Sequence, residues 1–176
     1  SRVDGVGKPY IYISGSTSSI SNIASGNVHS KMLNGQDAFL SKFDDSGRLV
    51  WGTYYGGSKI DQAIGVAIDD SGMVYITGST ESDTGISTPG AHQAGIFRNT
   101  NEKTNAFIAK FSDSGRLIWG TYYGGEGTRG QNITCYGKYI YLVGITSSPD
   151  SISTPNTHQP IYQGLNDVFI AKFDLS

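Results

Sequence analysis

The sequence contains an internal repeat of about 65 residues, and this repeat limits the folds that the chain can adopt. Residues 51–57 recur without change as residues 119–125, 68 positions later. Residues 37–43 recur with few substitutions as residues 105–111 and again as residues 167–173. The chain therefore holds nearly three copies of one structural unit, and each copy buries its apolar surface against its neighbours.

Each copy is predicted to form four short β-strands. In the second copy they cover residues 63–69, 73–79, 105–111 and 116–123, which are rich in Ile, Val, Phe, Tyr and Trp and are bounded by Gly, Asp or Ser. Glu occurs only three times and Leu only seven times, so good helix formers are scarce. Four antiparallel strands per repeat are typical of a β-propeller blade. The predicted fold class is therefore all-β, an open β-propeller of about two and three-quarter blades.

The repeat also predicts the domain organisation. Residues 1–57 are expected to form blade one, residues 58–125 blade two, and residues 126–176 an incomplete blade three, all within one propeller domain. Propeller rings need about four blades or more, so the chain is not expected to close a ring alone. We therefore expect it to bind other protein chains or the remainder of its own propeller.

The connections between the strands are of two kinds. Asp-Ser-Gly sequences such as residues 69–72 and 112–115 predict tight hairpin turns in which Gly47, Gly72 and Gly115 take positive φ angles. The connections between the second and third strands are long, and cover about residues 17–36, 80–104 and 147–166. In an up-and-down blade the turns lie at one rim, and the long connections lie at the other.

These motifs resemble the SBBP family, the β-propeller repeat of bacterial surface and secreted proteins. The resemblance is carried by residues 37–47, 49–57, 65–69, 74–78 and 87–93. Residues 136–138 depart from it, because Tyr-Gly-Lys replaces the Asp-Ser-Gly turn, and the first long connection lacks the Ser-Thr-Pro sequence of the other two. The resemblance implies an extracellular or cell-surface location. It implies no established catalytic residues, so none is predicted.

Composition excludes several classes of partner and site. The chain has 13 Lys and Arg against 15 Asp and Glu, a net charge of −2, which gives no basic surface for nucleic acid. Apolar runs are too short for a membrane span of about 20 residues. The single cysteine, Cys135, allows neither an internal disulfide nor a cysteine zinc site, and we expect an inert thiol. No cofactor is predicted.

Binding is expected on the face formed by the long connections, because strands that pack between blades cannot vary freely. The candidate residues are His92, Phe97, Arg98, His158 and Tyr162. The first and fourth of these occupy matching positions before Gln and could share a metal ion, but repeated packing explains them better, so no metal is predicted. No acidic pair that breaks the repeat stands out for catalysis.

The predicted function is that of a non-enzymatic extracellular module that serves as a structural scaffold or as an adhesion and protein-interaction surface. The alternative is a carbohydrate-binding propeller that uses the long-connection face, with glycans as partners. Trp51 and Trp119 could be sugar-binding platforms, but packing between blades accounts for them better, since each lies in a predicted strand. An enzyme is the third hypothesis.

Overall fold

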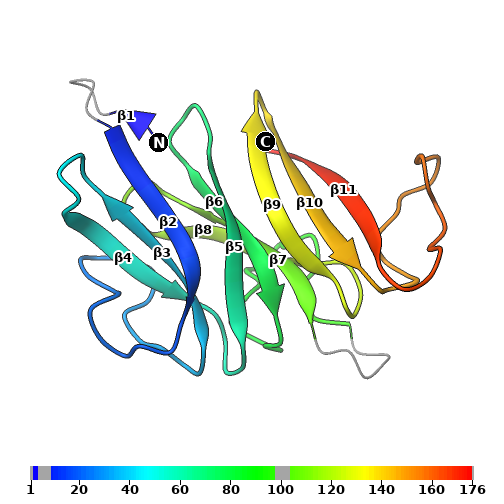
Figure 1. Ribbon diagram of the computed structural model, residues 1–176, viewed down its shortest axis with the longest axis horizontal. Coiled ribbons are helices and arrows are strands. Elements are labelled where there is room, and N and C mark those ends of the chain that lie inside the picture. Colours follow the sequence, from blue (N-terminus) through cyan, green and yellow to red (C-terminus); the bar gives the residue numbers. More distant parts are fainter. Residues whose placement is uncertain (1, 4–8, 98–103, 176) are drawn as a thin grey trace.

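The computed structural model describes residues 2–3, 9–97 and 104–175, and these form eleven strands in three antiparallel sheets that stand side by side (Figure 1). We call the sheets blade one, blade two and blade three. Blade one contains β1 (Arg2–Val3), β2 (Pro9–Thr17), β3 (Asp37–Phe43) and β4 (Leu49–Tyr55). Blade two contains β5 (Asp61–Ile68), β6 (Val74–Thr80), β7 (Asn105–Phe111) and β8 (Leu117–Tyr123). Blade three contains β9 (Arg129–Tyr136), β10 (Tyr139–Thr146) and β11 (Asp167–Asp174).

The predicted fold class is confirmed: the described residues form an all-β, open array of blades. The strands of blade two lie within two residues of their predicted bounds. The first of them, β5, begins at Asp61 rather than at residue 63, because Asp61 pairs with Thr80 at the end of β6. None of the described segments forms a helix that is long and apolar enough to cross a membrane.

The short connections are the tight turns that the sequence predicts. Gly47, Gly72 and Gly115 have φ angles of 77°, 88° and 80°, a region that glycine enters at little cost. The Asp44 carboxylate holds its turn, since it accepts hydrogen bonds from the Ser46 and Arg48 backbone N–H groups at 3.0 and 2.9 Å. In Figure 1 these turns lie along the upper rim of the molecule, and the long connections leave the strands at the lower rim.

Two apolar clusters fill the junctions between blades. The first joins Tyr12, Leu40 and Trp51 of blade one to Phe107 and Phe111 of blade two. The second joins the opposite face of blade two to blade three; its buried members include Tyr75, Ile108, Ile133, Leu142 and Phe169. Blade two is therefore covered on both faces, which explains why β6 is buried along its whole length.

The long connections do not simply project from the lower rim, because they fold back along the outermost strands of blades one and two. The Ser25 N–H donates to the Gly52 carbonyl at 2.9 Å, and the Thr88 N–H donates to the Gly120 carbonyl at 3.0 Å. An outermost strand carries unpaired backbone groups that would otherwise recruit another chain. The connections thus cover the outer edges of β4 and β8.

Candidate interaction site

The structure separates the residues that the sequence predicts for binding. His92 is exposed, but its ring lies 6.1 Å from Tyr123 and 5.6 Å from Phe173, at the junction of blades two and three. Phe97 is 44% exposed near the start of β7. His158 is exposed and Tyr162 half-buried, both in the connection of blade three. Arg98 lies outside the described residues, and within the described ranges no ring contact, ion pair or hydrogen bond joins any two of the other four.

A third histidine, His29, occupies the same place in blade one as His92 does in blade two. Its ring lies 5.9 Å from Tyr55 and 6.1 Å from Phe111, the counterparts of the two rings that contact His92. His29 is exposed as a residue, like His92, but partial burial of its ring lowers its pKa. This equivalence was not predicted, because the first connection lacks the Ser-Thr-Pro sequence. In the structure, His29 follows Ser25 by four residues and His92 follows Thr88 by four, and each of these earlier residues pairs with the outer strand of its blade.

The equivalence favours packing as the role of the repeated histidines. Two of them lie against aromatic rings of two successive blades, rather than beside each other. Among the described residues, no group of three or more His, Cys, Asp or Glu side chains is placed to hold a metal ion.

A pocket of about 510 Å³ opens beside the long connection of blade one. Its walls include His29, Met32 and Leu33 of that connection, together with Asp37 of β3 and Tyr54 of β4. Met32 is 79% exposed at its edge. The pocket therefore combines apolar side chains of a variable segment with one buried carboxylate.

The buried carboxylate belongs to an acidic pair that the sequence analysis did not identify. Asp37 is 2% exposed and Asp61 is 0% exposed, and a Cβ atom on Gly56 would lie 2.9 Å from Oδ1 of the first and 2.6 Å from Oδ2 of the second. Burial raises the pKa of both carboxyl groups. The pair breaks the repeat, because Asn105 of blade two and Thr128 at the start of blade three occupy the equivalent places at the next junction.

The two members of this pair differ in how their oxygens are satisfied. Asp61 accepts hydrogen bonds from the Gly57 N–H at 2.7 Å, from the Ser82 hydroxyl at 2.8 Å and from the Thr80 hydroxyl. Asp37 Oδ2 accepts the Asn34 N–H at 2.9 Å, but Oδ1 is buried with no hydrogen-bond partner among the described atoms. Asp61 is fully enclosed, whereas Asp37 borders the pocket beside the long connection of blade one.

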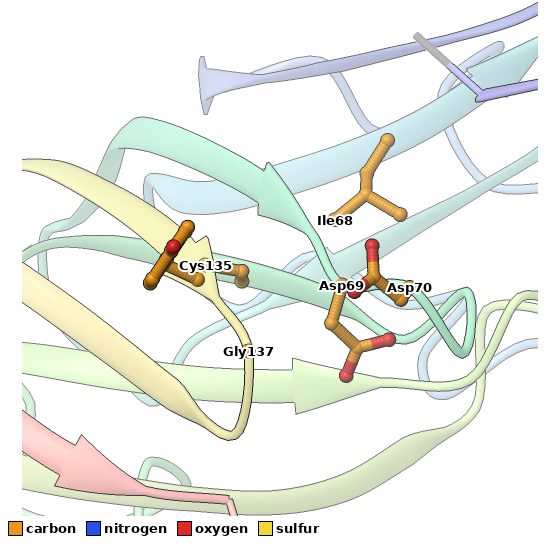
Figure 2. Close-up of a pocket in the computed structure, with 6 residues that line it drawn as sticks. Ile68, Asp69, Asp70, Cys135 and Gly137 are labelled. Carbon is orange, nitrogen blue, oxygen red and sulfur yellow. The ribbon is translucent and has the colours of Figure 1, made fainter.

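A second pocket, of about 470 Å³, lies on the turn rim between blades two and three. Figure 2 shows Ile68, Asp69 and Asp70 on one side of it and Cys135 and Gly137 on the other. Burial, together with the nearby Asp69 carboxylate, raises the pKa of the Cys135 thiol to about 11. The thiol therefore stays protonated at neutral pH and is a poor nucleophile, as expected for an inert cysteine.

Large exposed apolar side chains occur on all three long connections. They are Ile20 at 82%, Met32 at 79%, Phe97 at 44%, Ile161 at 69% and Leu165 at 90% exposed. The tryptophans are placed differently. Trp51 is 5% exposed, and Trp119 is half-buried with its ring edge-on to Tyr75 at 6.2 Å. The two tryptophans thus pack between blades, as predicted, while the connections present apolar side chains to solvent.

Three antiparallel sheets packed face to face define the class of this protein as a β-propeller-type repeat protein. Residues 50–83, from β4 through β6 to the start of the next long connection, match the family model of the SBBP β-propeller repeat. This segment of the chain thus matches one repeat of that family, which supports the resemblance drawn from the sequence motifs. No curated protein matches the chain.

Proposed function

We propose that the chain is a non-enzymatic module of a secreted or cell-surface bacterial protein, in which it forms a scaffold or adhesion surface that binds other proteins. β-propeller repeats of this family are generally non-catalytic and serve as interaction or scaffold modules. Asp61 of the acidic pair is enclosed, so the pair cannot present two carboxylates to a substrate, as acid–base catalysis by paired carboxylates requires.

The observation that carries this proposal is the exposure of large apolar side chains on the long connections. Met32 and Leu165 are 79% and 90% exposed, whereas the strand residues Leu40 and Ile108 at the blade junctions are 0% exposed. Interface cores are enriched in aromatic residues and Met, so such exposed side chains are suited to contact with a partner protein. The connections vary in length and sequence between blades, so they can set specificity while the blades stay rigid.

A carbohydrate-binding role is supported less well by the same side chains. Sugar-binding sites generally use exposed aromatic rings as flat platforms, and both tryptophans pack between blades instead. We therefore expect no retention on a glycan array. Retention that is lost when the connection residues Phe97 and Tyr162 are changed to Ala would establish the carbohydrate alternative instead.

Site-specific photo-crosslinking in the source bacterium tests the proposal. A photoreactive amino acid is placed at Met32 or Leu165 on the connections, and at the exposed turn residues Asp70 or Ser71 of blade two as matched controls. We expect protein crosslinks from the first two positions and few from the controls. Crosslinks only from the turn positions would place the partner on the other rim, and recovery of the protein in the cytoplasmic fraction would overturn the proposed location.

A further inference from the structure

The junction of blades one and two contains a lysine clamp that binds a turn of the next blade. Lys42 Nζ lies 3.9 Å from the centroid of the Tyr10 ring and 5.5 Å from that of Tyr12. It donates to both carboxylate oxygens of Asp113, at 2.7 and 2.8 Å, and Tyr12 donates to the same carboxylate through its hydroxyl. The Lys42 side chain is only 6% exposed, whereas that of Asp113 is 54% exposed, so the lysine is the desolvated partner of this ion pair. The clamp therefore binds an aspartate in the turn between the third and fourth strands of the next blade.

Blade three contains the same clamp on its outer face. Lys172 Nζ lies 3.6 Å from the centroid of the Tyr139 ring and 5.8 Å from that of Tyr141. These three residues are the repeat counterparts of Lys42, Tyr10 and Tyr12. Lys172 is exposed, and it forms no ion pair within the described ranges. The cation thus lies against two aromatic rings, and within the described ranges it lacks the ion pair that Lys42 forms.

The apolar residues next to this second clamp are exposed, although the equivalent residues of blades one and two are buried under a neighbouring blade. Val168 and Ile170 of blade three are 72% and 74% exposed. Their counterparts in blade one, Ala38 and Leu40, are 0% exposed, because blade two covers them. Their counterparts in blade two, Ala106 and Ile108, are also 0% exposed, because blade three covers them. At both internal junctions, therefore, this face of one blade packs against the opposite face of the next blade.

Blade one presents that opposite face to solvent. Ile11 and Ile13 are 47% and 45% exposed, whereas their counterparts Val74 and Ile76 are 0% exposed at the junction with blade one. Asp45 is exposed in the turn between β3 and β4, at the position that corresponds to Asp113. Blade one therefore offers both the apolar residues and the acidic turn residue that the outer face of blade three requires.

We propose that the outer face of blade three binds the outer face of blade one in a second copy of this chain. Asp45 of the second copy enters between Tyr139, Tyr141 and Lys172, as Asp113 does at the internal junction. The two faces are different surfaces, so the contact is head-to-tail and each copy can use both of its faces. Strands and turns form most of this contact, whereas the proposed function uses the long connections.

The repeated histidines add an independent match to this contact. His29 and His92 each lie against a phenylalanine of the following blade, at 6.1 and 5.6 Å. His158 is the third member of this series and is exposed. The corresponding phenylalanine of blade one is Phe43, so His158 contacts Phe43 of the second copy in the proposed assembly.

The second turn of the same sequence provides a matched control for testing Asp45. Residues 44–47 and 69–72 both read Asp-Asp-Ser-Gly, and in both the first aspartate holds the turn through its carboxylate. Asp45→Lys and Asp70→Lys therefore make the same change in the same local structure. Only the first lies at the position that the proposal places in the clamp. Lys31→Glu, at an exposed residue of the long connection, is the matched control for Lys172→Glu.

Sedimentation velocity of the 176-residue chain over a concentration series tests the proposal. We expect reversible assembly that either Lys172→Glu or Asp45→Lys weakens by about tenfold or more, while the two control variants assemble like the original chain. Mixing the Lys172→Glu and Asp45→Lys chains should restore assembly, since each junction in an alternating array then joins opposite charges. Thermal melts followed by circular dichroism verify that each variant is folded.

Three results would overturn the proposal. The first is an original chain that stays monomeric throughout the concentration series. The second is an assembly that the Lys172 and Asp45 variants leave unchanged. The third is an assembly weakened by each single variant but not restored by mixing them, because the two residues would then not face each other.

Discussion

The indole nitrogen of Trp51 donates a hydrogen bond to the backbone carbonyl of Asp113 at 2.9 Å. Trp51 lies on β4, and Asp113 lies in the turn between β7 and β8, so this bond joins the outer strand of blade one to the turn rim of blade two. Trp119 occupies the same position in blade two, but its indole forms no hydrogen bond within the described part of the chain. The same residue of the repeat thus has a hydrogen-bonded role at one junction and a packing role at the other.

Replacing each tryptophan by phenylalanine should separate these two roles. Both changes remove similar ring volume, but only Trp51→Phe leaves the Asp113 carbonyl without its indole donor. We expect Trp51→Phe to lower the free energy of unfolding by about 1 kcal/mol more than Trp119→Phe does. Urea denaturation of the two variants measures the difference. Equal losses would show that the indole hydrogen bond contributes nothing to stability.

The turn glycines should differ in their tolerance of a side chain. At Gly47 a Cβ atom would meet nothing within 4 Å, so Gly47→Ala is expected to cost only the strain of its φ angle of 77°, about 1 kcal/mol. At Gly115 the Cβ atom would lie 2.8 Å from Trp51 Cε3 and 3.0 Å from Val28 Cγ1. Gly115→Ala should therefore destabilise the chain clearly more than Gly47→Ala in thermal or urea unfolding. A larger loss at Gly47 would contradict this account of the junction.

The strands and short turns could be predicted from the sequence because their causes are local and are repeated. The recurrence of residues 51–57 locates the fourth strand, and the Asp-Ser-Gly turns fix where strands three and four meet. An aspartate that bonds to N–H groups two and four residues later needs no distant partner, so the turn at residues 44–47 is visible in the sequence alone.

The candidate site depends on contacts between distant segments, and the sequence indicated less of it. Asp37 and Asp61 are 24 residues apart and meet only because β3 and β5 belong to adjacent blades. His29 matches His92 through pairing with the outer strand, which periodicity cannot reveal. The course of the long connections could not be predicted either, because backbone hydrogen bonds such as that from Ser25 to Gly52 depend on no particular side chain.

The thiol of Cys135 should react slowly in the folded chain. Its pKa is raised to about 11, mainly by burial, so little thiolate is present at neutral pH. We expect alkylation by iodoacetamide at about pH 8 to be about a hundredfold slower in the folded chain than in urea, where the thiol returns to a pKa of about 8.5. Mass spectrometry over a time course measures both rates. Similar rates in the two conditions would show that the thiol is not protected.

Replacing Asp37 by asparagine should stabilise the chain, because blade two shows what this position requires. Asn105, the counterpart of Asp37, accepts the Phe97 N–H through Oδ1 at 2.9 Å and donates through its amide nitrogen to the Gly125 carbonyl. Asp37 accepts the equivalent bond from Asn34, but its other oxygen has no donor and lies near the Asp61 carboxylate. We expect Asp37→Asn to raise the free energy of unfolding at pH 7 by about 1 kcal/mol.

The pH dependence provides the sharper test of the same idea. Burial raises the pKa of Asp37, so the folded state favours the protonated carboxyl. That contribution to stability is fully present below the unfolded pKa of about 3.9 and is lost as the pH rises through the higher folded pKa. The advantage of Asp37→Asn in urea unfolding should therefore grow from about pH 4 upward and then level off. Asn105→Asp is the matched reverse change, and its loss of stability should grow over a similar range. If the difference between Asp37→Asn and the original chain is the same at every pH, Asp37 ionises as it does in the unfolded chain and the account of its unpaired oxygen is wrong.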